Sequence, residues 1–359
     1  MKYSFLFSIL IFVLFISCNK SETEAPPIID LEIISAVDIS SFPEIDLTNP
    51  VFFDLDDTPK GFLTILKNSG VNTIRLRLWV NPQNNHSSFE EVKQFAQILR
   101  TYNFKIWLTL HYSDTWADPG NQEIPAQWQG IPFEDLKDSV DVYTKKVVHQ
   151  IDPDLIQVGN EINPGFLHPY GNINSNPERF KELLNTAINA VRTNSTNAKI
   201  IIHYAGLSGS DWFYNQLDSI DYDIIGLSYY PIWHGKSLGD LKSKLTQLSE
   251  AHNKDILIAE TAYPFTLDWN DWTNNIVGLE GQLILPNFPA TEEGQRNFIN
   301  SIKNISTKDV TRGVGFCYWG AELIAWKGTQ ATDGSPWENQ SLFDFENKAL
   351  PVIEEFKTE

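Results

Sequence analysis

Cysteine is almost absent from this sequence. The 359 residues include two cysteines, Cys18 and Cys317, and Cys18 lies in the N-terminal segment discussed below. The body of the chain therefore has no pair of thiols for an internal disulfide, and its stability must come from a buried core. The apolar run around Cys317 indicates a buried thiol that packs as a small hydrophobic side chain.

Basic residues are also in short supply. The chain has 27 Lys and Arg against 46 Asp and Glu, which gives a formal net charge of −19. Most of such a surface repels a polyanion, so nucleic acid is not expected as a partner. A neutral ligand fits this charge better. The 11 tryptophans and the aromatic content of 13% suit stacking on sugar rings, although core packing accounts for most individual tryptophans.

Two further absences exclude classes of enzyme. Only 7 histidines occur, and no expected strand carries two of them at a spacing that could bind one metal ion. A metal-dependent barrel hydrolase, which needs clustered His and Asp ligands, is therefore disfavoured. No glycine-rich loop follows the first expected strand, which argues against an open dinucleotide-binding sheet.

An apolar run occurs at the N-terminus, from Phe5 to Ile16, shortly after Lys2. Its length is typical of a signal peptide and too short for an ordinary membrane-spanning helix. Residues 15–18, Phe-Ile-Ser-Cys, resemble a bacterial lipobox, in which the cysteine is lipidated, with Phe15 in place of the usual Leu or Val. The alternative is a plain secretory signal in which the cysteine occurs by chance.

These features predict the layout of the chain. We expect residues 1–17 to be a lipoprotein signal peptide, Cys18 to carry the lipid, and residues 18–30 to form a short tether. Residues 31–359 then form one domain, because no long linker or low-complexity stretch divides them. The expected product is a monomeric outer-membrane lipoprotein. A polysaccharide substrate too large for pores would place it on the cell surface.

Strand-length apolar runs alternate with helix-length segments over the body of the chain. The expected strands are 33–39, 73–80, 105–110, 155–158, 199–204, 224–228, 256–259 and 313–318. The expected helices are 89–100, 133–150, 177–192, 238–251 and 292–305. Strands buried on both faces, each followed by a helix, argue for a parallel sheet. Eight such units in about 320 residues predict an α/β fold with a single (β/α)₈ barrel, the TIM barrel.

Polar and aromatic side chains crowd the carboxyl ends of the expected strands, where barrel enzymes carry their chemistry. They are Arg77, Trp79 and Asn81 after the second strand, residues 111–116 after the third, Asn160 and Glu161 after the fourth, Ser228, Tyr229 and Tyr230 at the sixth, Glu260 and Thr261 after the seventh, and Tyr318 and Trp319 at the eighth. A purely structural barrel would not need this distribution, so we expect an active site at this end.

Two of these residues, Glu161 and Glu260, suit the cleavage of a glycosidic bond. That reaction needs a proton for the leaving oxygen and a partner for the developing oxocarbenium ion, and two carboxyl groups supply both. Each glutamate ends an apolar strand, where burial raises the pKa of a carboxyl group. Either one alone is equally well explained as a salt-bridged residue at a strand end. The two residues by themselves do not say which is the acid.

The segments around these glutamates resemble the endo-β-1,4-galactanases, or arabinogalactan galactanohydrolases, within the large clan of TIM-barrel retaining glycosidases. Four segments carry the resemblance: VNTIRLRLWVNP at 71–82, HYSDTWADPG at 111–120, QVGNEINPG at 157–165 and AETAYP at 259–264. The similarity runs from about Ser35 to Phe345. The long third-strand segment is the specific part, since Asn-Glu alone is a weak signal.

The resemblance implies roles for individual residues. Glu161 is the general acid/base and Glu260 the nucleophile, with retention of configuration. Arg77 lies beneath the carboxylates and keeps Glu260 ionised, and Tyr229 hydrogen-bonds the nucleophile. The remaining sugar-binding residues are Asp38, His111, Asp114, Asn160 for the 2-hydroxyl, Trp319 as the stacking floor, and Trp116 as a wall farther along. A structural ion pair for Arg77 and simple loop packing for Trp116 are the alternatives.

The sequence departs from the family pattern in two places. Residues 318–322, Tyr-Trp-Gly-Ala-Glu, stand where Tyr-Trp-Glu-Pro is expected, and residues 36–38, Ala-Val-Asp, stand where Gly-Ala-Asp is expected. Neither change touches the catalytic pair. The first affects the shape of the eighth loop and the outer sugar-binding subsites.

The resemblance also implies a structural calcium ion between the seventh and eighth loops, which some family members bind. Such a hard cation prefers clustered oxygen ligands. The candidate ligands here are Asp271, Thr273, Asn275, Ser341 and Asp344. Trp269 stands where a further oxygen ligand is expected, and the loop has no histidine. The alternative is a polar loop closed by hydrogen bonds. The chemistry itself requires no cofactor.

The predicted function is endo-acting, retaining hydrolysis of β-1,4-galactan, as in type I arabinogalactan, with release of galacto-oligosaccharides. One alternative is another endo-β-glycanase on the same barrel, such as a mannanase, xylanase or glucanase. A second is a non-catalytic, surface-anchored glycan-binding lipoprotein, which would have no need of both glutamates. The third-strand segment favours galactan.

Overall fold

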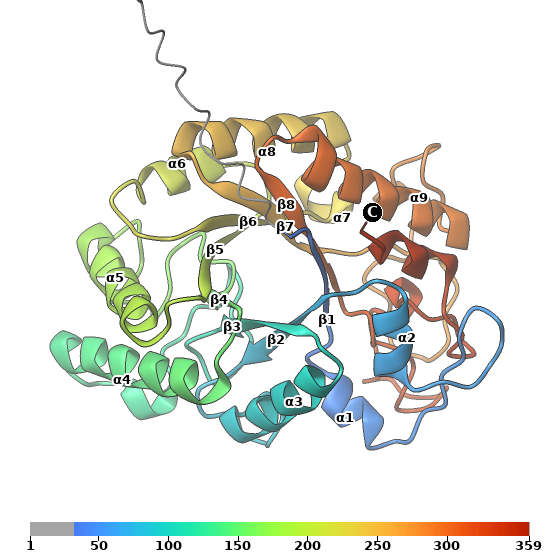
Figure 1. Cartoon of the computed structure of the whole chain (residues 1–359), viewed down its shortest axis with the longest axis horizontal. Helices are drawn as coiled ribbons and strands as arrows, with labels where there is room; N and C mark the ends of the chain where they lie inside the picture. Colours follow the sequence, from blue (N-terminus) through green and yellow to red (C-terminus); the bar gives the residue numbers. More distant parts are fainter. Residues whose placement is uncertain (1–31, 359) are drawn as a thin grey trace, which may run out of the picture. The chain divides into compact units, whose positions relative to one another are not determined.

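Eight parallel strands form a closed barrel in the computed structural model, which describes residues 32–358. The strands are β1 (Ile34–Asp38), β2 (Thr73–Leu78), β3 (Lys105–Leu110), β4 (Leu155–Val158), β5 (Lys199–Ala205), β6 (Ile224–Ser228), β7 (Asp255–Thr261) and β8 (Gly313–Trp319). Each strand pairs with the next along the chain, and β8 pairs with β1. Figure 1 shows the strands around a central axis with the long helices outside them. The predicted TIM barrel is confirmed.

The helices of the described chain run between the strands. They are α1 (Phe42–Asp46), α2 (Phe62–Asn68), α3 (Phe89–Thr101), α4 (Phe133–Ile151), α5 (Pro177–Asn194), α6 (Ser210–Asn215), α7 (Pro231–His234), α8 (Leu238–His252) and α9 (Glu292–Asn304). Short 3₁₀ or π turns lie at Ala126–Trp128, Glu280–Gln282, Ile305–Asp309, Glu338–Gln340 and Pro351–Phe356. The five predicted helices correspond to α3, α4, α5, α8 and α9.

Helix α3 shows why the sequence places a helix there. The Ser88 side chain accepts a hydrogen bond from the Glu91 amide and so caps the first turn. Val92, Phe95 and Leu99 are buried on the face toward the barrel. The amphipathic spacing in the sequence therefore determines which side of the helix packs on the strands.

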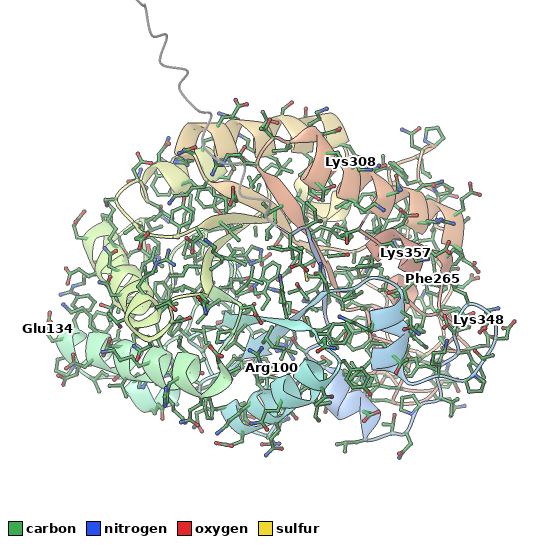
Figure 2. All side chains as sticks on the ribbon, in the orientation of Figure 1. Arg100, Glu134, Phe265, Lys308, Lys348 and Lys357 are labelled. Atoms are coloured by element: carbon green, nitrogen blue, oxygen red, sulfur yellow. The ribbon has the colours of Figure 1, made fainter. Side chains whose placement is uncertain are left out.

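The barrel interior is filled by side chains, as Figure 2 shows, whereas the labelled Glu134 on α4 lies at the outer edge. In β2 the apolar residues Ile74 and Leu76 belong to the hydrophobic core, while Arg75 alternates with them and contacts polar groups inside the barrel. This alternation leaves the inner positions of β2 free for polar chemistry. Cys317 on β8 is fully buried and unpaired, as predicted.

The structural description begins at Glu32, and the compact unit that contains the barrel begins at Ile33. The predicted signal peptide (1–17), Cys18 and the whole of the tether (18–30) lie outside the described residues. Between residues 32 and 358, no helix is long and apolar enough to cross a membrane.

Candidate active site

A cleft of about 810 Å³ opens at the carboxyl ends of the strands. Its wall combines the two predicted catalytic glutamates with a large share of aromatic residues. The lining residues include Ser41, Trp116, Asp118, Asn160, Glu161, Tyr230, Trp233, His234, Glu260, Trp319, Leu323 and Trp337. The structure therefore brings β1, β3, β4, β6, β7 and β8 together at one concave site, as the strand-end pattern predicted.

Glu161 and Glu260 face each other across this cleft. A carboxylate oxygen of Glu161 and one of Glu260 lie within 4.8 Å of each other. Such a short separation is that of retaining glycosidases, in which one carboxylate attacks the sugar directly, rather than that of inverting ones. Glu161 follows β4 in the left-handed region, with a φ of 46°, after Gly159 with a φ of 78°. A non-glycine residue rarely adopts this conformation, which marks the turn as a specialised one.

The ion pair that neutralises Glu260 is made by Arg75. Its Nη2 atom lies 2.8 Å from Glu260 Oε1, and its Nη1 atom lies 2.8 Å from Asp38 Oδ2. The same Nη2 atom donates to Asn160 Oδ1 at 2.9 Å. Arg75 therefore holds the nucleophile candidate, Asp38 and Asn160 in one buried network, and its fixed charge favours the ionised form of Glu260.

The placement of Arg77 beneath the carboxylates was wrong. Arg77 lies two residues beyond Arg75 on β2, about 6.6 Å farther along the strand toward its carboxyl end. Its guanidinium carbon lies 3.9 Å from the ring centre of Trp116 and 4.6 Å from that of Trp79. It donates to Ser87 Oγ at 3.1 Å. Arg77 therefore packs against Trp79 and Trp116. Arg75, which lies one layer deeper in the barrel, makes the ion pair with Glu260.

The hydrogen bond expected from Tyr229 is made by Tyr230. The Tyr230 hydroxyl donates to Glu260 Oε2 at 3.1 Å, whereas the Tyr229 hydroxyl donates to the Gly235 carbonyl at 2.8 Å. Successive side chains of an extended segment point to opposite faces. Ser228 and Tyr230 therefore point toward the two glutamates and Tyr229 points away, so the prediction missed by one residue.

The surroundings of the two glutamates are unequal. Burial raises the pKa of Glu161, and the neighbouring Glu260 carboxylate raises that pKa further. Burial also raises the pKa of Glu260, but the Arg75 charge and the Tyr230 hydroxyl oppose that rise. A single proton held by the pair therefore lies on Glu161. This arrangement gives an acid at Glu161 and a charged nucleophile at Glu260.

Asn160 lines the cleft beside Glu161, and its amide nitrogen donates to the Ala117 carbonyl at 2.8 Å. His111 and Asp114 do not line the cleft. His111 Nδ1 accepts the Ala117 amide hydrogen at 3.0 Å. The two Asp114 carboxylate oxygens accept backbone amides of the second and third loops, at 2.9 and 2.8 Å. The side chains of these two residues therefore hold the third-strand loop in shape, whereas the sequence had predicted that they contact the sugar directly.

Four tryptophans form a continuous wall along the cleft. Trp116 lies 6.1 Å from Trp319, Trp319 lies 4.6 Å from Trp337, and Trp337 lies 6.2 Å from Trp233, measured between ring centres. Trp116 is 41% exposed and Trp233 is 54% exposed. Trp233 and Trp337 were not predicted. Trp233 lies on the short helix α7 after β6 and Trp337 in the loop after β8, and in both places the sequence shows only a high tryptophan content.

The five residues predicted to hold calcium do not fit that ion. Asp271 accepts the amides of Thr273 and Ser335, and a Cβ atom on Gly334 would lie 2.0 Å from its Oδ2 atom. The Ser341 hydroxyl donates to Ala321, and Asp344 accepts two amides of its own turn. Of the five, only Asn275 has a buried side-chain oxygen without a hydrogen-bond partner. Hydrogen bonds close the seventh loop, whereas calcium needs six to eight free oxygen ligands.

A ring nitrogen of His203 also lies within 4.8 Å of the Glu161 and Glu260 carboxylates, and this is the one such cluster of potential metal ligands within residues 32–358. The cluster does not suit a metal ion. The two ring nitrogens of His203 lie at hydrogen-bond distance from Ser228 and Gln157, and Arg75 already supplies the positive charge at Glu260.

Known proteins share this architecture. The family model described as Glycosyl hydrolase family 53 matches residues 34–356. The arabinogalactan endo-β-1,4-galactanase of Cellvibrio japonicus is 33% identical over 318 residues, which cover 82% of this chain and 83% of the relative. The GH53 catalytic domain of Ignisphaera aggregans is 33% identical with a TM-score of 0.86, over 92% of this chain and 97% of that one. A fungal β-1,4-galactanase is 28% identical with a TM-score of 0.78, over 90% and 98%. The chain therefore belongs to glycosyl hydrolase family 53.

Proposed function

We propose that this protein is an endo-acting, retaining hydrolase of β-1,4-galactan that releases galacto-oligosaccharides. One observation carries the proposal: Glu161 and Glu260 lie within 4.8 Å of each other, and only Glu260 is paired with a guanidinium group, that of Arg75. This unequal pair supplies a proton and a nucleophile at one sugar carbon. The chemistry needs no cofactor.

In the first step the Glu260 carboxylate attacks the anomeric carbon while Glu161 gives its proton to the leaving oxygen. The glycosidic bond breaks and a covalent glycosyl-enzyme forms. In the second step Glu161, now a carboxylate, takes a proton from water as the water oxygen attacks the same carbon and Glu260 leaves. Arg75 and Tyr230 stabilise the Glu260 carboxylate before attack and after release.

Substrate binding follows from the cleft wall. Asn160, fixed by Arg75 and Ala117, lies beside Glu161 and serves the sugar 2-hydroxyl at the cleavage site. Trp319 is the stacking floor, and Trp116 extends the wall to one side. Four of the predicted sugar-binding residues act indirectly. Arg77 supports the tryptophan wall, His111 and Asp114 accept hydrogen bonds from loop amides, and Asp38 pairs with Arg75.

The substrate assignment is supported by the relatives whose names specify β-1,4-galactanase activity. Mannan, xylan and glucan are the competing substrates. Purified protein should be assayed on all four polysaccharides, with proton NMR of the first product. We expect cleavage of galactan with an initial β-anomer. Preference for another glycan, or an initial α-anomer, contradicts the assignment. Binding without cleavage supports the glycan-binding alternative.

We also propose that the protein is a monomeric outer-membrane lipoprotein anchored through Cys18 on the cell surface. The support is the apolar run from Phe5 to Ile16 that ends at a lipobox-like Ser17-Cys18. Cells that express the full chain should incorporate labelled palmitate into it, and Cys18→Ala should not be labelled. Protease treatment of intact cells distinguishes the two membrane faces, and light scattering of the detergent-free mature domain reports its oligomeric state.

A further inference from the structure

A row of polar side chains lies behind Glu161, on the side away from the cleft. Ser228 Oγ, at the end of β6, donates to Glu161 Oε1 at 2.5 Å. His203 Nε2, on β5, lies 2.8 Å from Ser228 Oγ. Both Ser228 and His203 are 0% exposed. No step described above uses either residue, although buried polar groups of this kind are held in a fixed arrangement by their partners.

The direction of these hydrogen bonds follows from Gln157. Its Oε1 atom lies 3.3 Å from Arg75 Nη2, and because a guanidinium group only donates, the atom there must be the oxygen. The amide nitrogen of Gln157 therefore faces His203 Nδ1, at 3.0 Å. An amide nitrogen donates, so Nδ1 accepts and the ring proton lies on Nε2.

The remaining contacts agree with this tautomer. Asn160 Oδ1, which lies 3.2 Å from His203 Nδ1, already accepts from Arg75 at 2.9 Å, and the second hydrogen of the Gln157 amide can go to the Gly159 carbonyl at 3.0 Å. With its proton on Nε2, His203 donates to Ser228. The Ser228 hydroxyl is then free to donate its own proton to Glu161, so every group in the row donates toward the acid.

We propose that His203 and Ser228 are positioning residues that form a donor relay, which keeps the Glu161 proton on Oε2 and supports the carboxylate once that proton has left. The inference rests on the proposed function. Glu161 Oε1 is occupied as an acceptor, whereas the structure shows no protein partner for Oε2 among the described residues, and Glu161 lines the cleft. The proton therefore resides on the oxygen that can reach the glycosidic bond.

No proton moves along the relay. When the Glu161 Oε2–H bond breaks, the proton goes to the leaving oxygen and the negative charge appears on the Glu161 carboxylate. Ser228 continues to donate to that charge, and His203 continues to donate to Ser228. Burial lowers the pKa of His203, and the positive charge of Arg75 and the rings of His111 and His234 lower it further, so the imidazole stays neutral throughout.

The relay has a measurable effect because a hydrogen bond to the charged form of an acid lowers its pKa. The groups that face Glu161 are Glu260, Arg75, Asp118 and Ser228, and among them Ser228 and Arg75 stabilise the carboxylate. Without Ser228 the pKa of Glu161 rises. The alkaline limb of the pH–rate profile, which reports loss of the acid proton, should then move to higher pH.

The decisive variants are Ser228→Ala and His203→Leu, with His203→Gln as the variant that keeps a donor to Ser228. The control is Ser249→Ala, an equally buried serine on α8 whose hydroxyl donates within its own helix. On galactan we expect Ser228→Ala to lower kcat about 10- to 100-fold, the effect of losing a hydrogen bond to a charged group. Its alkaline limb should move up by about one pH unit.

We expect His203→Leu to follow Ser228→Ala, and His203→Gln to lie close to wild type. An aryl galactobioside with a dinitrophenol leaving group needs no acid, so bond cleavage in it should be nearly unaffected in every variant. A folded Ser228→Ala variant with the wild-type alkaline limb overturns the relay. Wild-type protein that cleaves no galactan overturns the proposed function instead, so the two failures are distinguishable.

A second measurement uses the wild-type protein alone. The ¹⁵N shifts of the His203 ring, assigned by their loss in His203→Gln, report which nitrogen carries the proton. We expect the Nε2–H tautomer on both sides of the alkaline limb. A ring with its proton on Nδ1 and a bare Nε2 cannot donate to Ser228, and that result overturns the proposal without any activity assay.

Discussion

Arg75 and Glu260 form a buried ion pair of 2.8 Å at the base of the cleft, with side-chain exposures of 2% and 9%. The pair joins the end of β7 to the interior of β2. Removing one partner leaves the other charge buried and unpaired, and this strongly lowers the free energy of unfolding. Catalysis and stability are therefore coupled at this point.

Arg75→Met should lower kcat by two orders of magnitude or more and move the acidic limb of the pH–rate profile to higher pH. The pKa of Glu260 rises without the guanidinium charge, and Glu260 must be ionised to attack. Unfolding should become easier by about 3–5 kcal/mol. Arg77→Met is the matched control, because Arg77 contacts tryptophan rings and makes no ion pair among the described residues. An unmoved acidic limb in Arg75→Met would contradict this account.

Glu161→Gln and Glu260→Gln should each reduce galactan cleavage by about three orders of magnitude or more. The two losses should differ in kind. With an activated aryl galactobioside, Glu161→Ala should form the glycosyl-enzyme normally, and azide should then accelerate its turnover and give a β-galactosyl azide. Glu260→Ala should instead give an α-azide. Exchanged stereochemistry would reverse the two roles.

Trp337→Ala should raise KM for galactan about 5- to 10-fold and change kcat little, since Trp337 borders the cleft and packs on the outer side of the wall against Trp319 and Trp233. Short aryl substrates that do not reach Trp337 should be cleaved as before. Trp212→Ala provides the control, because this tryptophan is 48% exposed on α6 and does not line the cleft. An equal loss in both variants would point to a general effect on the fold.

Glu322 makes stability depend on pH. It is 2% exposed, and burial raises its pKa from 4.5 to about 8. A carboxyl whose pKa is raised in the folded state stabilises the fold below about pH 4.5, and that contribution is lost as the pH rises toward about 8. Glu322→Gln removes the charge and should raise Tm by about 2–6 °C at pH 8.5, with little change at pH 4.5. Calorimetry at both pH values measures this, and an equal Tm shift at both would count against it.

Chelation should leave the protein unchanged. Asp271, Ser341 and Asp344 are engaged by protein hydrogen bonds, so removal of divalent cations should move Tm by less than about 1 °C. Calorimetry with and without EDTA, together with elemental analysis of the untreated protein, measures this. Stoichiometric calcium, and a fall in Tm on its removal, would show that the loop rearranges around an ion.

The barrel was predictable because its signal is repeated eight times. Each strand is a short apolar run, and each of the predicted helices has an apolar face at regular spacing, as in α3 with Val92 and Leu99. The positions of Glu161 and Glu260 follow from the same pattern, since each is the first acidic residue after the apolar run of its strand. The position of a residue along a strand can be read from the sequence alone.

The ion-pair and hydrogen-bond partners of these glutamates could be identified only from the three-dimensional structure. Arg75 and Arg77 share one face of β2, and only the stagger of the barrel decides which of them reaches Glu260. Tyr229 and Tyr230 differ by one residue at the end of β6, where a register shift occurs beside Ser228. Trp233 lies on the short helix α7 and Trp337 in the loop after β8, and packing sets the position of both, so no periodicity in the sequence places them at the cleft.

The isolated thiol of Cys317 has a practical consequence for handling the protein. Its side chain is fully buried on β8, and no other cysteine lies between residues 32 and 358. The barrel therefore reaches its native state without any oxidation step. Reducing agents should not harm the folded enzyme, and production in the cytoplasm of a bacterial host should yield the same domain as export. Alkylating reagents should modify Cys317 only when the barrel opens, so its rate of labelling measures how often the barrel unfolds.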